Sequence, residues 1–187
     1  EYPPPLDAVR AAGPQAARVM ALRYRLIAEE LRAVGIDSNC APVGDVLSAA
    51  THPFLANRCY SDDPAAVTEL ARVVAEAHLA SGVLPVIKHM PGHGRAAGDT
   101  HLALPTVSTD LETLIATDFS VFRALNHLPM AMTAHIVFSA VDDRPATCSP
   151  PMIRLIRERI GFGGLLMTDD GGMEALSGTK AGRAAAA

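Results

Sequence analysis

The chain has 187 residues, of which 49% are hydrophobic, and carries a net charge of −4, so we expect one domain with a sizeable core. Acidic and basic residues are interspersed without a basic stripe, which argues against a nucleic-acid partner. Three cysteines without C-x-x-C spacing favour a reducing compartment. No apolar stretch approaches the roughly 20 residues that span a bilayer, and the first residues lack a signal-peptide pattern. We therefore expect a cytoplasmic protein with no membrane partner.

The first predicted unit is a helix followed by a strand. Apolar residues recur near a 3.6-residue period over 15–34 and predict an amphipathic helix that ends at Gly35. Its predicted apolar face consists of Val19, Leu22, Leu26, Ile27, Leu31 and Val34. Residues 36–46 are expected to form a strand that runs into a loop.

A second unit begins with a clear helix start. Asp63 can cap the helix and Pro64 suits its first position, where the missing N–H costs nothing. The stripe predicted to be buried consists of Val67, Leu70, Val74 and Ala77. The helix is expected to end at Ser81-Gly82, and residues 83–87 to form a buried strand.

Two further units follow in the second half of the chain. The capping-box pattern at 109–112 predicts a helix that continues to Leu125, followed by a strand over 130–138. Ser149-Pro150 predicts a fourth helix that ends at Gly161. A last strand is expected over 164–168, with another helix beginning after about residue 172.

Four successive helix–strand units favour an α/β fold in which helices cover a parallel sheet. Polar residues cluster just after the strands, namely Asp45, Lys88, His89, His135, Asp169 and Asp170. The carboxyl ends of the strands carry the site in such folds, so this placement favours an enzyme. The pattern does not separate a barrel from an open sheet. A complete eightfold barrel needs about 250 residues, so a barrel would be incomplete in this chain.

The segment 88–101 holds the densest cluster of reactive side chains. It contains three histidines, a lysine, an arginine, an aspartate and three glycines directly after a buried strand, as is usual in binding and catalytic loops. Asp99 and His101 are two residues apart, so in an extended loop they share a face. A carboxylate bonded to one ring nitrogen fixes the tautomer and leaves the other nitrogen to exchange protons. The alternative is that both are solvated loop residues.

The second candidate is the strand-end carboxylate of Asp169. It could be a nucleophile, a metal ligand or a helix cap, and we expect Asp169 to be functional and Asp170 structural. Arg58 lies in the loop before the Pro64 helix and could be a surface residue or a binding residue. His135 could be a buried, hydrogen-bonded histidine or line the site, and we favour the second.

Metal chemistry is an alternative to these assignments. His89, His93, Asp99, His101 and His135 could supply ligands to a catalytic metal, but their spacing matches no specific zinc pattern such as H-E-x-x-H. The phosphate-binding pattern G-x-x-x-x-G-K-[ST] and the nucleophile pattern G-x-S-x-G are both absent from the sequence. We expect no metal and no organic cofactor.

Four segments resemble the bacterial β-N-acetylglucosaminidases of glycoside hydrolase family 3. Residues 88–94, four further residues and then Asp99-Thr100-His101 are similar to the family signature K-H-F-P-G-H-G…D-S-H. Residues 166–170 resemble the nucleophile motif S-D-D-L. Residues 57–60 resemble N-R-S-F, and residues 41–46 resemble A-P-V-x-D-V.

The resemblance implies a TIM-barrel domain that removes terminal β-linked N-acetylglucosamine through a covalent glycosyl-enzyme intermediate. Its substrates would be cell-wall recycling fragments, N-acetylglucosaminyl-1,6-anhydro-N-acetylmuramyl peptides. Carried onto this sequence, Asp169 is the nucleophile, His101 the acid/base and Asp99 its orienting partner. The residues that would hold the sugar hydroxyls are Arg58, Lys88 and His89. Compared with the family, residues 1–187 are expected to be a partial barrel domain without its first and last segments.

Three alternatives to this reaction remain at the level of sequence. One is a metal-dependent hydrolase that uses the histidine loop. A catalytically inactive fragment or paralogue would keep the fold and bind the sugar without turning it over. Phosphorolysis would replace water by phosphate, because a neutral imidazole repels phosphate less than a carboxylate does.

Overall fold

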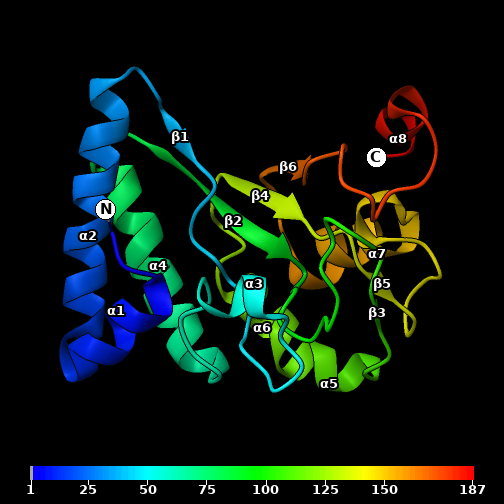
Figure 1. Ribbon diagram of the computed structural model, residues 1–187, viewed down its shortest axis with the longest axis horizontal. Coiled ribbons are helices and arrows are strands. Elements are labelled where there is room, and N and C mark those ends of the chain that lie inside the picture. The colour runs from blue at the N-terminus through cyan, green and yellow to red at the C-terminus, as the bar shows by residue number, and fades with distance from the viewer. Residues whose placement is uncertain (1) are drawn as a thin grey trace.

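The computed structural model describes residues 2–187 (Figure 1). Its helices are α1 Pro5–Ala12, α2 Ala16–Ala33, α3 Pro53–Ala56, α4 Pro64–Ala80, α5 Leu111–Ala116, α6 Asp118–Ala124, α7 Pro150–Leu155 and α8 Lys180–Ala186. Its strands are β1 Ser38–Asn39, β2 Leu84–Met90, β3 Thr106–Val107, β4 Met130–Thr133, β5 Val137–Phe138 and β6 Leu165–Thr168. Within these residues, no helix combines the length and the apolar character needed to cross a bilayer.

The main sheet has four parallel strands in the order β1-β2-β4-β6, which is also their order along the chain. A doubly wound sheet reverses its strand order at a switch point, whereas this sheet does not. Right-handed crossovers between successive strands then place their helices on one face, as in a TIM barrel. Strand pairing therefore resolves the choice that the sequence pattern left open, and the chain has an incomplete TIM-type barrel fold.

The predicted helix starts at Asp63 and Ser149 are confirmed. The Asp63 carboxylate accepts hydrogen bonds from the amides of Ala65 and Ala66, and the Ser149 hydroxyl accepts one from the amide of Met152 at 3.1 Å. The stripe predicted on α4 is buried throughout, with Val67, Leu70, Val74 and Ala77 each at most 6% exposed. The segment after α7 continues as a π-helical turn, Ile156–Ile160, and ends at Gly161 with a positive φ of 79°, as predicted.

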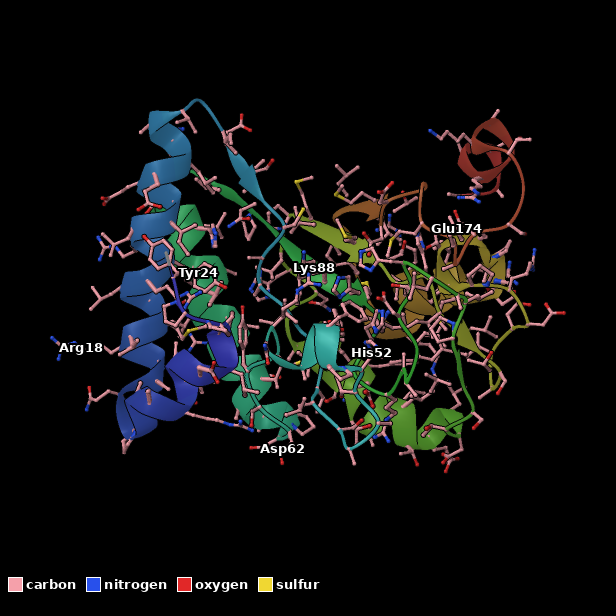
Figure 2. All side chains as sticks on the ribbon, in the orientation of Figure 1. Arg18, Tyr24, His52, Asp62, Lys88 and Glu174 are labelled. Carbon is pink, nitrogen blue, oxygen red and sulfur yellow. The ribbon has the colours of Figure 1, made fainter. Side chains whose placement is uncertain are left out.

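The apolar face predicted for α2 is only partly right, because Ile27 packs against the core whereas other members of the face are exposed. Leu22 and Leu26 are each 53% exposed and Val34 is 73% exposed. The residues of α2 that are buried are Met20, Tyr24 and Ala28. Figure 2 shows Tyr24 between α2 and α4, where its ring lies 5.2 Å from that of His78 on α4. Tyr24 and Ala28 set the rotation of α2 about its axis, because an aromatic ring and a small alanine allow α2 and α4 to pack closely.

The third predicted helix and the strand after it are each divided in two. The helix breaks at Thr117 between α5 and α6, and the chain turns so that Asp118 meets Arg95, with 2.6 Å between Asp118 Oδ2 and Arg95 Nε. The cap of α5 is Asp110, which accepts from the amide of Thr113, one residue later than the capping box predicted. The predicted strand 130–138 forms β4 in the main sheet and β5, which pairs with β3.

The strand predicted over 83–87 also continues further than expected, through Met90. Its last residues are held by Asp45, which is fully buried. Asp45 Oδ1 accepts from the backbone amides of His89 at 3.1 Å and His93 at 2.7 Å, and Oδ2 accepts from His89 Nδ1 at 2.7 Å. Burial alone would raise the pKa of Asp45, but His89, His93 and these hydrogen bonds hold that pKa below its ordinary value. The carboxylate therefore stabilises the folded chain in its ionised form.

We predict that Asp45→Asn lowers the free energy of unfolding at pH 7 by about 3–5 kcal/mol, the usual cost of breaking a buried charge pair. A depressed carboxyl pKa contributes stability above the unfolded value, near 3.9, and loses it as pH falls through the folded value. The gap between the unaltered protein and Asp45→Asn should therefore narrow below about pH 4. Urea unfolding at several pH values measures this.

Asp63→Asn is the matched control, because asparagine caps a helix about as well as aspartate. It should leave the free energy of unfolding almost unchanged at every pH measured. Equal stability of Asp45→Asn and the unaltered protein at pH 7, or a gap that widens in acid, would contradict the assignment.

Candidate functional site

A cavity of about 220 Å³ opens at the carboxyl ends of the strands. Figure 2 shows Lys88 near the end of β2 in the middle of the molecule, with His52 close to α3. The cavity is lined by Arg58, Lys88, His89, His93, His101 and Asp169, together with apolar groups such as Phe54 and Met132. Five of the six site residues predicted from sequence thus meet in one space. The sixth, Asp99, contacts the cavity through His101.

Strand β2 presents Lys88 and His89 to this cavity. Because a carboxylate only accepts hydrogen bonds, Asp45 must accept the Nδ1–H of His89 at 2.7 Å. The Nε2 atom of His89 then faces the cavity, 3.8 Å from Asp169 Oδ2. In the neutral ring Nε2 accepts a hydrogen bond from a ligand, and in the protonated ring it donates one. Both forms can bind a hydroxyl group.

Asp169 follows β6 and is held by its own turn. Its Oδ1 accepts a hydrogen bond from the backbone amide of Asp170 at 2.8 Å, which leaves Oδ2 on the side of His89. The side chain is 21% exposed, so one carboxylate oxygen remains within reach of a ligand in the cavity. Asp170 uses its side chain to accept from the amide of Gly172 at 2.7 Å, which gives it a structural contact.

Asp99 and His101 form a pair in the exposed loop after β2. Asp99 Oδ1 accepts from the backbone amide of His101 at 2.9 Å and from its Nδ1 at 2.7 Å. These hydrogen bonds hold the pKa of Asp99 below its ordinary value. The His101 side chain is 59% exposed, and within residues 2–187 its ring is hydrogen-bonded through Nδ1, not through Nε2. The ring packs edge-on against Phe54, with 5.5 Å between the centroids.

The loop that carries His101 is tethered at both ends. At its start, the Arg95 guanidinium pairs with the buried Asp118 carboxylate at 2.6 Å and donates to the Thr117 hydroxyl at 3.1 Å. Further along, the carbonyls of Thr100 and His101 accept from the amides of Ala175 and Glu174 at 3.2 and 3.4 Å. Because residues 174 and 175 directly follow the Asp169 turn, the two candidate catalytic segments are joined by hydrogen bonds.

The cavity keeps two cationic side chains for a ligand. Within residues 2–187, the basic side chains that form ion pairs are Arg72, His89, Arg95, His101 and Arg144. Arg58 and Lys88 therefore remain available. Burial, followed by the nearby Arg58, lowers the pKa of Lys88 from its ordinary value. No three histidine, cysteine, aspartate or glutamate side chains of residues 2–187 are arranged to hold a metal ion.

His135 does not line this cavity, and our expectation for it is wrong. It is 1% exposed, its Nε2 donates to the carbonyl of Asp170 at 3.1 Å and its Nδ1 contacts the hydroxyl of Thr147 at 2.8 Å. Burial lowers its pKa. His135 lies on the segment after β4 and is hydrogen-bonded through both ring nitrogens. Its contact with the Asp170 carbonyl stabilises the turn that carries Asp169.

Sequence reasoning missed Phe54 and did not find the roles of Asp45 and His93 in the site. Asp45 was expected among the strand-end residues, but its partners His89 and His93 lie more than 40 positions away. The His93 ring forms a wall of the cavity. Phe54 packs against both His93 and His101, with centroid distances of 5.7 and 5.5 Å. The apolar residues around Asp45 in the sequence indicated that Asp45 would be buried, whereas no sequence pattern pointed to a role for Phe54.

Three hollows are larger than this cavity. One of about 490 Å³ is bordered by residues of α2 and the end of α4, and two others, of about 500 and 370 Å³, are lined partly by residues of α8. The larger of these two is bordered by Asp170, Lys180 and Arg183, and the other by Arg144, Glu174 and Arg183. No imidazole borders any of the three within residues 2–187. We assign the site to the smaller cavity, because the strand-end carboxylate, the paired loop imidazole and Lys88 converge there.

The chain is similar to known proteins over nearly its whole length. The model of the glycosyl hydrolase family 3 N-terminal domain matches residues 9–187. A beta-hexosaminidase of Methylococcus capsulatus is 42% identical over 167 residues, which cover 87% of this chain and 50% of that protein. The chain thus spans about half the length of the curated relatives it matches.

Two solved structures share the fold. A family 3 β-N-acetylglucosaminidase from Paenibacillus sp. superposes with a TM-score of 0.86 at 32% identity, over 97% of this chain and 35% of that chain. NagZ from Neisseria gonorrhoeae, in complex with N-trifluoroacetyl-D-glucosamine, gives a TM-score of 0.80 at 34% identity, over 86% of this chain and 48% of that chain. On this evidence, the chain belongs to the family of glycosyl hydrolase family 3 N-terminal domains.

Proposed function

We propose that the protein containing this chain is a retaining exo-β-N-acetylglucosaminidase. The observation that carries the proposal is that Asp169 and His101 line the same cavity of about 220 Å³, with His101 held by Asp99. A retaining glycosidase needs a nucleophile on one side of the glycosidic bond and, on the other, an acid that later becomes a base. A rigid strand-end carboxylate and an exposed, oriented imidazole suit these two roles.

In the first step, Asp169 Oδ2 forms a bond to the anomeric carbon while the bond to the leaving oxygen breaks. The Nε2–H of protonated His101 gives its proton to that oxygen. In the second step, neutral His101 takes a proton from water, whose oxygen attacks the anomeric carbon and releases Asp169. Asp99 stabilises the imidazolium and keeps Nε2 directed away from itself. After one turnover His101 has regained the proton that it gave to the leaving group.

The other polar residues of the cavity are suited to the sugar. Arg58 and Lys88 offer charged donors, and His89 Nε2 can accept from or donate to a hydroxyl. The cavity is smaller than the roughly 300–1,000 Å³ usual for drug-sized ligands, so it suits one sugar ring at a chain end. We assign Arg58, Lys88 and His89 to the binding of the sugar hydroxyls.

The leaving group would lie at the open side of the cavity. His101 is on the exposed loop, and its neighbour Leu102 is 76% exposed, so a large aglycone can be accommodated there. We propose N-acetylglucosaminyl-anhydro-muropeptides, the fragments of cell-wall recycling, as substrates, with the reaction in the cytoplasm. The sugar in this proposal is supported by the N-trifluoroacetyl-D-glucosamine bound to the related NagZ. The cytoplasmic location is supported by the three free thiols of Cys40, Cys59 and Cys148, which fit a reducing compartment.

We predict that Asp169→Ala in the full-length protein reduces the release of nitrophenol from the β-N-acetylglucosaminide to background, because no covalent intermediate can form. Asp170→Asn is the matched control and should retain most of the activity, since the Asp170 carboxylate accepts its hydrogen bond from Gly172. The unaltered protein should be equally active in EDTA. Activity that survives Asp169→Ala, or that EDTA removes, would contradict the assignment.

We predict that the effect of His101→Ala depends on the leaving group. Loss of the acid should slow cleavage of a disaccharide, whose leaving oxygen needs a proton, by about 10²–10⁴-fold. Formation of the intermediate from a dinitrophenyl glycoside should change far less, because that leaving group departs without a proton. Pre-steady-state bursts with the two substrates measure the difference, and Asp99→Asn should show the same pattern in weaker form. An equal loss with both substrates would exclude His101 as the acid.

A further inference from the structure

The ring of His93 is buried without a polar partner. The residue is 2% exposed, and neither Nδ1 nor Nε2 has a hydrogen-bond partner among residues 2–187. His89 and His135, the other buried histidines near the site, are both hydrogen-bonded. Buried polar groups are nearly always paired in native structures, so an unpaired imidazole requires an explanation.

The ring is also held where it is. The His93 backbone amide donates to Asp45 at 2.7 Å, and the rings of His89 and Phe54 pack edge-on with centroids 5.3 and 5.7 Å away. The next residue, Gly94, lies so close to Val46 that a Cβ would stand 1.7 Å from its carbonyl oxygen. Backbone and neighbours therefore hold the ring, and both of its nitrogens are shielded from solvent. A partner from the cavity therefore reaches a ring nitrogen only when the wall beside it shifts as the ligand binds.

The cavity is the space from which a partner can come. His93 lines it beside His89. Burial and then the neighbouring His89 lower the pKa of His93 to about 4, so at neutral pH the ring is neutral, with one donor and one acceptor nitrogen. A hydroxyl group also donates and accepts, and it can pair with either tautomer. A carboxylate could satisfy only the donor, and a cation only the acceptor.

We propose that His93 is a further sugar-binding residue, which exchanges a hydrogen bond with the ring hydroxyl that lies beside His89. This inference rests on the proposed function and adds a residue to its binding site. The wall of the cavity then selects for a sugar that carries a hydroxyl at this position, since a sugar without it leaves the imidazole unpaired. Discrimination by an unpaired buried group is stronger than discrimination by shape.

The test uses the full-length protein and three variants. His93→Phe keeps a ring and removes both nitrogens, and His93→Gln keeps one donor and one acceptor. His127→Phe is the control, because it makes the same exchange at an exposed histidine outside the cavity. Calorimetric titration measures the Kd of N-acetylglucosamine and of its 3-, 4- and 6-deoxy analogues. Thermal unfolding reports the stability of each protein.

We expect His93→Phe to weaken binding of N-acetylglucosamine by about 3- to 10-fold, the value of one neutral hydrogen bond. One deoxy analogue should bind the unaltered protein and His93→Phe equally, because it lacks the hydroxyl in question. His93→Gln should recover part of the affinity, and His127→Phe should leave it unchanged. The melting temperature of His93→Phe should stay the same or rise, because a buried unpaired polar group is removed.

Unchanged affinity in His93→Phe, or equal weakening for every analogue, would overturn the proposal, the latter pointing to a buried water or a structural role. If His93→Phe does not fold, His93→Met also lacks ring nitrogens and carries the same comparison with His93→Gln. Binding without turnover in the unaltered protein would overturn only the proposed glycosidase function. No binding of N-acetylglucosamine to the unaltered protein would overturn both.

Discussion

The buried carboxylate of Asp45 is the contact on which the site depends. It joins the segment after β1 to the end of β2 by accepting from two backbone amides and from the ring of His89. These hydrogen bonds direct His89 Nε2 towards Asp169 and hold the backbone at His93, where the exposed loop begins. The carboxylate is fully buried, so any arrangement that separates it from its partners would leave an uncompensated charge in the interior. The buried charge therefore favours the one arrangement in which these partners are in place. His89 and His93 owe their positions to this one group.

The fold divides the site into a rigid half and an exposed half. Strand β2 supplies Lys88 and His89, and Asp169 directly follows β6. Parallel pairing through β4 brings the carboxyl ends of both strands to the same edge of the sheet. The loop supplies the Asp99–His101 pair, tethered to the segment after Asp169. This division fits the proposed two-step reaction, in which the sugar and the proposed nucleophile would stay fixed while the leaving group departs and water enters at the open side. A histidine at the mouth can serve both steps.

Local patterns in the sequence were sufficient for the helix starts at Asp63 and Ser149, the strand-end carboxylate and the Asp99–His101 contact, since each depends on neighbouring residues. They were insufficient wherever distant residues decide. The buried face of α2 was only partly right because Leu22 and Leu26 form a regular apolar stripe, whereas Tyr24 makes the contact with His78 of α4. The end of β2 was placed too early because its polar side chains face a cavity, which periodicity does not register. Asp45 and His89 are 44 residues apart, and the order of strands comes only from pairing.

Covalent trapping tests the central claim most directly. A 5-fluoro derivative of N-acetylglucosamine with a dinitrophenyl leaving group forms the glycosyl-enzyme faster than water removes it, so the intermediate accumulates. Mass spectrometry of a proteolytic digest of the full-length protein should then show one added sugar on the peptide that contains Asp169. An adduct on another side chain, or rapid turnover that leaves no adduct and yields the α-anomer first, would contradict the account.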